Sequence, residues 1–132
     1  MTVDLTDTQR AYLASQRLGR LATVDSSGQP YNKPVGFFLD EESGVIDIGG
    51  ARMGQSAKWR HVQTNPRVSL VVDDVASVRP WRVRGIEIRG RAETVTDWKP
   101  PFAGFSRQAI RIRPERIVSW GLEDLEADGK DG

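Results

Sequence analysis

The first fifty residues change from a helical to an alternating pattern of apolar and polar positions. Thr6 and Gln9 form the pair expected of a capping box, and the apolar positions after them predict a helix over 6–16, which Gly19 ends. From Arg20 onward the pattern alternates and turn-forming residues recur, as in antiparallel strands with one face in a core. We expect three sequential strands here, over 20–24, 30–39 and 45–49.

One more helix and three more strands are expected in the rest of the chain. Ser56 is the predicted N-cap of a helix over 57–64, and Asn65-Pro66 ends that helix. The strands are a β-branched run that we expect to be buried, a long alternating segment and a last strand, over 67–73, 83–94 and 109–120.

These strands carry predicted irregularities and are joined by loops. Gly85 or Gly90 is expected to kink the long strand, and Pro114 to mark a bulge or break in the last one. We expect residues 97–108 to be a loop, and the loops over 73–80 and 98–106 to shape substrate specificity. Six strands with two short helices predict a mainly β chain, folded as a six-stranded antiparallel barrel.

The composition fits one domain with a core. The chain has 132 residues, of which 38% are hydrophobic and 28% charged. A chain of this size buries roughly two thirds of the surface that it exposes when unfolded. We expect residues 1–120 to form that domain and the acidic residues 121–132 to form a disordered tail.

Cysteine and histidine usage excludes several kinds of site. The chain has no cysteine and one histidine, which excludes disulfides, thiolate zinc sites, iron–sulfur clusters and a cysteine nucleophile. A serine triad would need His61 held by a carboxylate, and we expect His61 to be a partly exposed helix residue instead. The sequence therefore predicts no metal site and no obligatory catalytic acid or base.

The sequence shows no membrane-spanning or secretory segment. No stretch approaches the roughly 20 apolar residues that cross a bilayer. The first ten residues lack the basic and then apolar profile of a signal peptide. We therefore expect a cytoplasmic protein with no membrane partner.

The net charge of +1 conceals three cationic segments. Residues 52–67, 79–91 and 107–116 carry net charges of +4, +4 and +3. If the fold brings these segments together, the protein has an anion-binding surface.

The segment after the strand over 45–49 carries the residues of a phosphate grip. Two glycines are followed by Arg52, then by the helix N-cap Ser56 and by Lys58 in the first helical turn. A lysine there faces the positive end of the helix dipole, and a bound anion would correct that mismatch. Free backbone N–H groups could therefore hold a phosphate together with these three side chains. The alternative is that Arg52 and Lys58 are ordinary solvated cations.

The cationic segment 79–91 mixes arginines with apolar residues on both faces of its strand. Such a strand can lie at an interface or beside a polar ligand, although arginines on an exposed edge strand are also ordinary. Trp59 and Trp81 are large enough to stack on a planar ring, or they pack in the core.

An ordered series of motifs resembles one known family. The motifs are LGRLAT, GQPYNKPVGF, VIDIGG, NPRVSLVV and RGIEIRGRA, at 18–23, 28–37, 45–50, 65–72 and 84–92. Over residues 6–120 the chain resembles the pyridoxamine 5'-phosphate oxidase-like split-barrel flavoproteins. It is most similar to the actinobacterial branch that uses the deazaflavin coenzyme F420.

The resemblance implies a homodimer of split barrels with cofactor sites at the subunit interface. The cofactor phosphate is then held at the positions of Arg52, Met53, Gly54, Gln55, Ser56 and Lys58. The flavin-type ring lies along the strand of Asn32, Lys33, Pro34, Val35, Gly36 and Phe37. The dimer partner contributes from the region of Trp81, Arg82 and Arg84.

The resemblance also implies a redox cofactor, with F420 expected and FMN as the alternative. F420 adds a phosphodiester and an oligoglutamate tail to the single phosphate of FMN, and surplus cations could hold these: Arg60, Arg82, Arg84, Arg107 and Arg111. We therefore expect an oxidoreductase that uses reduced F420 to transfer a hydride to a conjugated or electron-poor small-molecule acceptor. A cofactor that carries the chemistry also explains why the sequence lacks catalytic residues.

Three alternatives stay open. The first is an FMN-dependent oxidase or reductase on the same fold, and the second is a non-catalytic protein that carries flavin or haem. The third is a small barrel that binds single-stranded nucleic acid through the arginines and tryptophans. Glu87 and the acidic C-terminal residues argue against nucleic acid.

Overall fold

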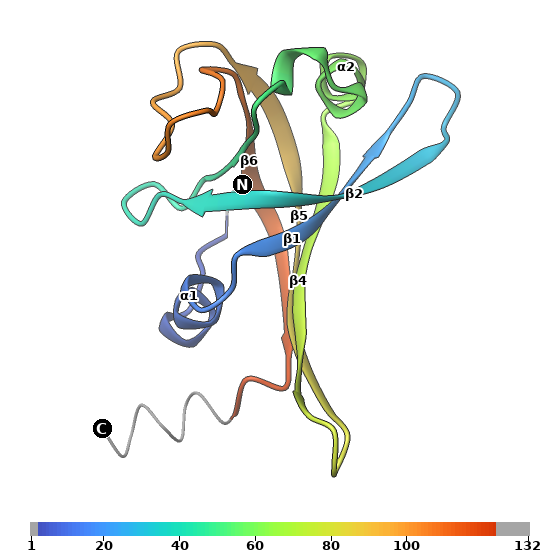
Figure 1. Cartoon of the computed structure of the whole chain (residues 1–132). Coiled ribbons are helices and arrows are strands. Elements are labelled where there is room, and N and C mark those ends of the chain that lie inside the picture. Colours follow the sequence, from blue (N-terminus) through green and yellow to red (C-terminus); the bar gives the residue numbers. More distant parts are fainter. Residues whose placement is uncertain (1–2, 124–132) are drawn as a thin grey trace.

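The computed structural model describes residues 3–123, which form a closed antiparallel barrel with two helices and a short 3-10 helix, η1. In chain order the elements are α1 (Asp7–Ala14), β1 (Leu18–Val24), β2 (Pro30–Leu39), β3 (Ile46–Gly49), η1 (Met53–Gln55), α2 (Ala57–Thr64), β4 (Arg67–Ser77), β5 (Arg82–Val95) and β6 (Ala109–Trp120). The strands pair in the order β1-β2-β3-β6-β5-β4, and β4 pairs with β1 to close the barrel (Figure 1). This confirms the mainly β, six-stranded antiparallel barrel expected from the sequence. Residues 124–132 of the predicted tail lie outside the described residues.

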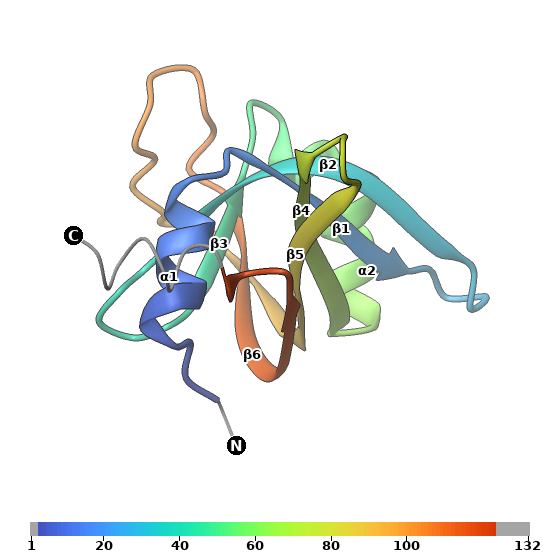
Figure 2. The same cartoon turned by 90° about the horizontal axis from the view of Figure 1, so that it is seen from below.

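The two helices lie at opposite ends of the barrel. In Figure 1, α2 is at the top, whereas α1 lies lower, toward the end where the turn between β4 and β5 projects. Figure 2, seen from below, has α1 in front of the barrel and α2 behind it. A site at the start of α2 is therefore remote from the β4–β5 turn of the same chain.

Helix α1 begins as predicted but ends earlier. Thr6 Oγ1 accepts a hydrogen bond from the Gln9 amide at 3.1 Å, and Gln9 Oε1 accepts one from the Thr6 amide at 2.9 Å, so the capping box is present. The helix ends at Ala14, and the prediction that Gly19 ends it is wrong. Gly19 lies in β1, where a Cβ atom would come within 2.9 Å of Leu70 Cδ1. The glycine is needed for close packing inside the barrel.

Strand β4 corrects two predictions. Val68, Leu70 and Val72 are buried and the residues between them are not, so the predicted buried run alternates instead. A barrel buries only its inner face, and β-branched residues serve equally well on the outer one. The strand also continues to Ser77, because its pairing with β5 extends beyond the barrel, so most of the predicted loop 73–80 is strand.

The predicted irregularities of β5 and β6 form one bulge. Arg89 pairs with Arg116 whereas Gly90 pairs with Pro114, which leaves Glu115 as an extra residue on β6. A side chain at position 90 would clash with the carbonyl of Arg113. The structure therefore confirms a bulge at Pro114 and places Gly90, not Gly85, opposite it.

The barrel interior is filled by aliphatic side chains from all six strands. Fully or almost fully buried examples, one from each strand, are Leu21, Val35, Ile48, Leu70, Ile88 and Ile110. Because every strand contributes inward residues, the core holds the outward-facing surfaces of β1 and β2 in fixed positions.

Candidate functional site

A cavity of about 310 Å³ lies between the start of α2 and strands β1 and β2. We call it the lysine pocket. Its lining consists of Thr23, Tyr31, Lys33, Pro34, Ser56, Ala57 and Lys58. The structure thus brings together four predicted site residues from two segments that are more than twenty residues apart in the sequence.

Two lysines give this pocket its electrostatic character. The pKa of Lys58 is lowered, first by its partial burial and then by the positive charge of Lys33. No acidic side chain lines the pocket, and neither lysine forms an ion pair within residues 3–123. An anion bound between the two ammonium groups would replace their repulsion with two attractions. The residues present therefore fit an anionic group such as a phosphate.

The start of α2 contributes backbone donors rather than its cap hydroxyl. Ser56 Oγ accepts a hydrogen bond from the Trp59 amide at 3.3 Å, as predicted for the N-cap, and donates one to the Met53 carbonyl at 2.6 Å. The Ser56 hydroxyl therefore already donates one hydrogen bond and accepts another. The amides of Ala57 and Lys58 open the helix and have no acceptor in its preceding turn. These amides and the Lys58 ammonium group are the donors best placed for a phosphate.

The predicted site residues before Ser56 lie in η1 or directly before it, and they differ in the groups that they could contribute to ligand binding. The side chain of Met53 is buried in the core, which leaves only its backbone for a ligand. Gly54 packs against the Gln108 amide group, which a Cβ atom would approach to 2.5 Å. Arg52 and Gln55 are exposed, and of these two only Arg52 adds a cation near the pocket segment.

His61 is buried, contrary to the sequence-based expectation. Its side chain is 8% exposed, and its Nδ1 lies 2.8 Å from Thr23 Oγ1. The ring also lies 4.5 Å, centroid to centroid, from the ring of Tyr31. Thr23 and Tyr31 both line the lysine pocket, so His61 supports the pocket from behind. Sequence reasoning missed this role because α2 is short and its inward face could not be identified from one histidine.

The predicted ring-binding strand, β2, connects the lysine pocket to a second cavity. Lys33 and Pro34 line the first, whereas Gly36 and Phe37 line the second. Val35 between them points into the core and Asn32 is exposed. A strand rises about 3.3 Å per residue, so the segment between the cavities has the length of a small ring system.

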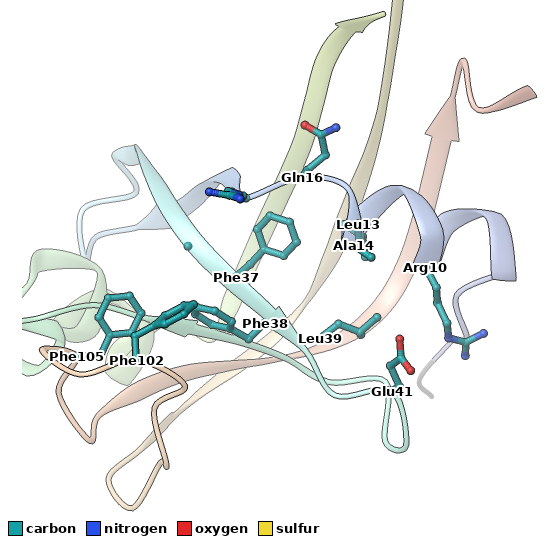
Figure 3. A pocket seen from close by; sticks show the side chains of 12 residues that line it. Arg10, Leu13, Ala14, Gln16, Phe37, Phe38, Leu39, Glu41, Phe102 and Phe105 are labelled. Atoms are coloured by element: carbon teal, nitrogen blue, oxygen red, sulfur yellow. The ribbon is translucent and has the colours of Figure 1, made fainter. Parts of the chain in front are cut away.

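The second cavity, of about 710 Å³, lies between α1, β2 and the loop after β5. We call it the aromatic cavity. Figure 3 shows Phe38, Phe102 and Phe105 gathered at one end, and Arg10 and Glu41 at the other. The sequence signalled only part of this cavity, through the loop 97–108 and its phenylalanines.

Four aromatic rings cluster at the apolar end of this cavity, and three of them, Phe38, Phe102 and Phe105, line it. The rings of Phe102 and Phe105 lie 5.9 Å apart, and both lie within about 6 Å of Phe38. Trp98 stacks on Phe105 at 6.4 Å with an interplanar angle of 22°. Phe102 nevertheless keeps 61% of its surface exposed. The cluster thus presents an uncovered aromatic surface to the cavity.

Backbone contacts hold the loop that carries these rings. The Trp98 amide donates to the Arg107 carbonyl and the Ser106 amide donates to the Gly50 carbonyl, both at 2.9 Å. Trp98 also packs on Gly49 so closely that a Cβ atom there would overlap the indole ring. The base of the loop is therefore fixed to the end of β3.

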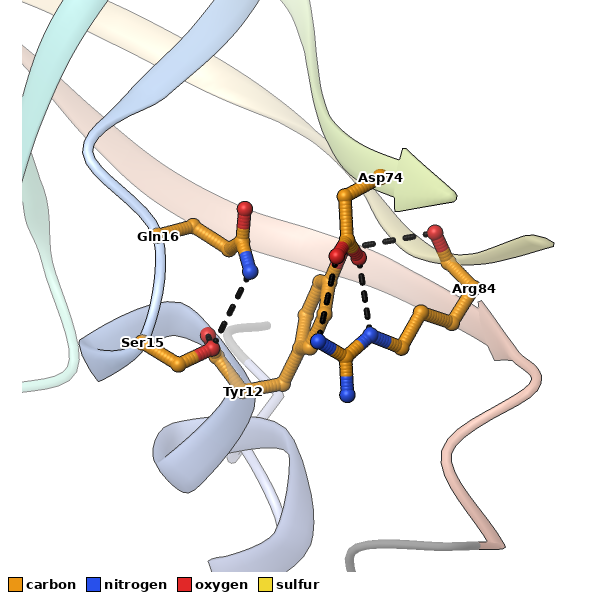
Figure 4. A network of polar contacts seen from close by, with 5 residues as sticks. All are labelled: Tyr12, Ser15, Gln16, Asp74 and Arg84. Atoms are coloured by element: carbon orange, nitrogen blue, oxygen red, sulfur yellow. Dashed lines mark hydrogen bonds and ion pairs between the residues drawn. The ribbon is translucent and has the colours of Figure 1, made fainter. Parts of the chain in front are cut away.

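Helix α1, the opposite wall, is fixed by a polar network (Figure 4). The Tyr12 hydroxyl donates to Asp74 Oδ1 at 2.7 Å, and Arg84 donates to both oxygens of Asp74, at 2.8 and 3.0 Å. Burial and then the bond to Asp74 raise the pKa of Tyr12, and the hydrogen bond from Arg84 lowers that of Asp74. Arg84, predicted to close the cofactor site, is thus engaged in this network within its own chain.

Trp81 and Arg82 lie away from the lysine pocket of the same chain. Trp81 lies in the β4–β5 turn and Arg82 is the first residue of β5, and this turn is at the opposite end of the barrel from α2 (Figure 1). Trp81 is 66% exposed, so the interpretation that it packs in the core is wrong, whereas Trp59 is buried. Apolar side chains along the same hairpin and at the end of β6 are also exposed, and we call the group the hairpin patch: Val75, Val78, Trp81, Val83, Val118 and Trp120.

Ion pairs occupy several of the arginines expected to be surplus. Arg111 donates to both oxygens of Asp47, at 2.8 and 3.1 Å, and the pKa of Arg111 is raised by this contact. Arg107 lies 4.0 Å from Asp97, and Arg60 bonds to carbonyls at the start of α2. These contacts engage part of the positive charge that the cationic segments bring to a single chain.

Two further kinds of site find no support in the part of the chain from residue 3 to residue 123. No group of three or more histidine, aspartate or glutamate side chains there could hold a metal ion. No helix in the same range is long and apolar enough to cross a bilayer.

Comparison with known sequences assigns the family. The profile of the pyridoxamine 5'-phosphate oxidase family matches residues 5–121. The chain belongs to this family. The match spans every strand of the barrel and both cavities, so the resemblance seen in the sequence motifs is confirmed.

Individual members and structures agree with this assignment. A 5a,11a-dehydrotetracycline/5a,11a-dehydrooxytetracycline reductase from Streptomyces rimosus is 45% identical over 124 residues, covering 89% of this chain and 84% of the relative. The conserved hypothetical protein Rv2991 of Mycobacterium tuberculosis superimposes with a TM-score of 0.69 at 22% identity, covering 95% of this chain and 89% of that one. A solved F420 reductase gives 0.66 at 23% identity, covering 86% and 98%. The structural matches show the shared fold.

Proposed function

We propose that the chain is a reductase that uses the reduced deazaflavin coenzyme F420 to reduce a conjugated, electron-poor organic acceptor. Family membership and the 45% identical reductase support the coarser statement, an oxidoreductase of the flavin or deazaflavin type. A solved protein of this fold is itself named an F420 reductase, so the fold is compatible with that coenzyme.

The lysine pocket is the observation that carries the proposal. Lys33 and Lys58 repel each other there and no acidic side chain lines the pocket, so both lysines would attract an anion. The amides at the start of α2 could donate hydrogen bonds to the same anion. A coenzyme phosphate is an anion that fits both the two lysines and these amides. Beyond it, β2 leads from Lys33 to Gly36 and Phe37, where the coenzyme ring would lie against the strand.

The protein itself binds and orients the coenzyme and the acceptor. When bound, a reduced deazaflavin would supply a hydride to the electron-poor carbon of the acceptor and lose a proton to solvent, and the acceptor would take up a proton from solvent, so that the coenzyme ends oxidised by two electrons. No side chain near β2 has to act as an acid or base for this transfer. Orientation of two planar molecules in a partly dry site accounts for the catalysis.

A second copy of the chain completes the proposed site. Trp81 and Arg82 cannot reach the lysine pocket of their own chain, and the hairpin patch exposes apolar area that water disfavours. A homodimer that buries this patch would bring the β4–β5 turn of one copy to the cofactor of the other. The predicted roles of these two residues therefore depend on dimerisation.

FMN is the second candidate cofactor. Arg84 and Arg111 are committed to Asp74 and Asp47, which leaves fewer free cations for the phosphodiester and oligoglutamate of F420. The lysine pocket by itself suits a ligand with one phosphate. The same ion pairs weaken the alternative of a nucleic-acid-binding barrel, because phosphate contacts dominate such binding.

Lys58→Ala tests the phosphate grip. Loss of a charge-assisted contact should weaken coenzyme binding by roughly ten- to a hundredfold. Binding of F420 and of FMN is measured separately by fluorescence titration of the full chain. Lys58→Arg, which keeps the charge, should retain most of the affinity, and Arg116→Ala on the exposed face of β6 should retain all of it.

Three results would contradict the proposal. Unchanged affinity in Lys58→Ala would remove the lysine pocket as the phosphate site. Tight FMN binding without F420 binding would replace the deazaflavin with the flavin. Turnover is measured with reduced F420 and a panel of enone and quinone acceptors, and binding without any turnover would indicate a carrier instead of a reductase.

A further inference from the structure

We propose that the aromatic cavity is the acceptor site and that it selects planar, fused-ring acceptors bearing an anionic group. That the ligand is an acceptor rests on the proposed function, whereas the binding of such a ligand in this cavity does not. The cavity and the lysine pocket are separate volumes that meet the same strand at Gly36–Phe37 and Lys33–Pro34. A coenzyme anchored at Lys58 would therefore reach the rim of the aromatic cavity and leave its volume for a second molecule.

The size and composition of the cavity indicate a polycyclic ligand. A volume of about 710 Å³ lies within the range of about 300–1,000 Å³ found for sites of drug-sized molecules. Phe102 lies edge-on to both Phe38 and Phe105, at 6.0 and 5.9 Å, and still exposes 61% of its surface. A flat ring system that covered Phe102 would bury this surface and gain stacking contacts.

The lining charges indicate the polar group of the ligand. Arg10 and Arg17 line the cavity together with one acidic residue, Glu41, so the charge of the lining is positive. Arg10 has a weak contact with Asp7 at 3.4 Å, whereas Arg17 is exposed and has no ion-pair partner within residues 3–123. An acidic phenol, enol or carboxylate on the ligand would pair with these guanidinium groups while its rings lie on the aromatic wall.

Both walls are held in place before any ligand arrives. The Tyr12–Asp74–Arg84 network fixes α1, and the contacts of Trp98 with Gly49 and Arg107 fix the loop. A site formed in advance loses less entropy on binding, which favours a rigid, flat ligand over a flexible chain.

The test uses anthraquinone-2-sulfonate, a planar anionic three-ring quinone, and the uncharged 2-hydroxymethylanthraquinone. Their binding to the full chain free of cofactor is measured by equilibrium dialysis. Phe102→Ala should weaken both probes by roughly three- to tenfold, since stacking on an aromatic side chain contributes that much. Phe102→Tyr, which keeps the ring, should leave both affinities close to the original. Arg17→Gln should weaken the sulfonate by about threefold and leave the uncharged probe unchanged.

Lys58→Ala separates this inference from the proposed function. It should lower coenzyme affinity and leave the affinity for both probes unchanged. If probe binding falls with Lys58→Ala and not with Phe102→Ala, the probes occupy the lysine pocket and the inference is wrong. Absence of probe binding to the original chain at millimolar concentration would also overturn it. If the probes bind as expected and neither F420 nor FMN does, the cavity assignment stands and the proposed function fails.

Discussion

At the scale of single residues, neighbouring carboxylates of one strand have different roles. Asp74 is partly buried and accepts hydrogen bonds from Arg84 and Tyr12, whereas Asp73 forms an exposed ion pair with Arg20. An exposed pair contributes little to stability because solvent screens it. The Asp74 network is less exposed, since Arg84 and Asp74 keep 22% and 28% of their side-chain surfaces exposed, and it joins α1 to β4 and β5 through the Tyr12 hydroxyl.

Asp74→Asn is expected to destabilise the fold by about 2 kcal/mol, because it leaves Arg84 without its charged partner. Asp73→Asn, the matched control one residue away, should change the free energy of unfolding by less than about 0.5 kcal/mol. Urea denaturation measures both. Equal effects of the two substitutions would show that the network does not hold α1.

The pKa of Asp74 adds a pH dependence to this prediction. Its pKa is lowered in the folded protein, so the unfolded chain binds the proton more readily. The contribution is therefore complete above the ordinary aspartate pKa of about 4 and is lost as the pH falls through the lower folded value. Unfolding curves at pH 3 to 7 should show a smaller acid loss in Asp74→Asn. An identical acid loss in both proteins would contradict this assignment.

At the scale of elements, the end of β3 decides where the aromatic loop lies. Gly49 and Gly50 are adjacent, but only Gly49 is covered by the Trp98 ring, and nothing lies within 4 Å of a Cβ atom at Gly50. The sequence motif contains both glycines and does not distinguish them. Only the folded loop shows that one of the two is required for packing.

Gly49→Ala should therefore destabilise the fold by about 1–3 kcal/mol, since the methyl group forces Trp98 away from β3. It should also shift the tryptophan fluorescence and weaken anthraquinone-2-sulfonate binding, because the loop carries Phe102 and Phe105. Gly50→Ala is the matched control and should change none of these measurements. Equal stability of the two variants would show that the loop is not fixed at Gly49.

Much of the element order could be read from the sequence, and the exceptions have physical causes. The capping box at Thr6, the N-cap Ser56 and the bulge at Pro114 are local features, and the structure has all three. The end of α1, the alternation of β4 and the burial of His61 were predicted wrongly. The burial pattern of β4 and the burial of His61 depend on contacts with distant strands, which a local pattern does not contain, whereas α1 ends at a cap that Ser15 forms with the Tyr12 carbonyl.

At the scale of the whole molecule, the exposed hairpin patch indicates a missing partner. Trp81 and Val78 expose about two thirds of their surfaces, and both lie in the turn between β4 and β5, which projects from the barrel (Figure 1). Large apolar surfaces of this kind are usually covered in an assembly. The proposed homodimer would use this patch and thereby link dimerisation to cofactor binding.

The double substitution Val78→Ser and Trp81→Ser should shift the protein from dimer to monomer at micromolar concentration, because it removes apolar surface from the proposed interface. Sedimentation velocity measures the mass, and coenzyme affinity should fall at the same time. Phe102→Ser removes a similarly exposed aromatic residue elsewhere and should leave the mass unchanged. A monomeric original chain, or a variant that stays dimeric, would count against this interface.

The sequence by itself determined the class of fold, the succession of helices and strands along the chain, the helix N-caps and the absence of cysteine chemistry. These depend on local periodicity, on short-range hydrogen bonds and on which atoms are present at all. Only the tertiary structure decided that Lys33 meets Lys58, that Arg84 and Arg111 are paired, and that the phenylalanines of one loop face helix α1 across a cavity. Such juxtapositions arise from the closure of the barrel, which brings together residues far apart in the chain, and the net charge of +1 carries no trace of them.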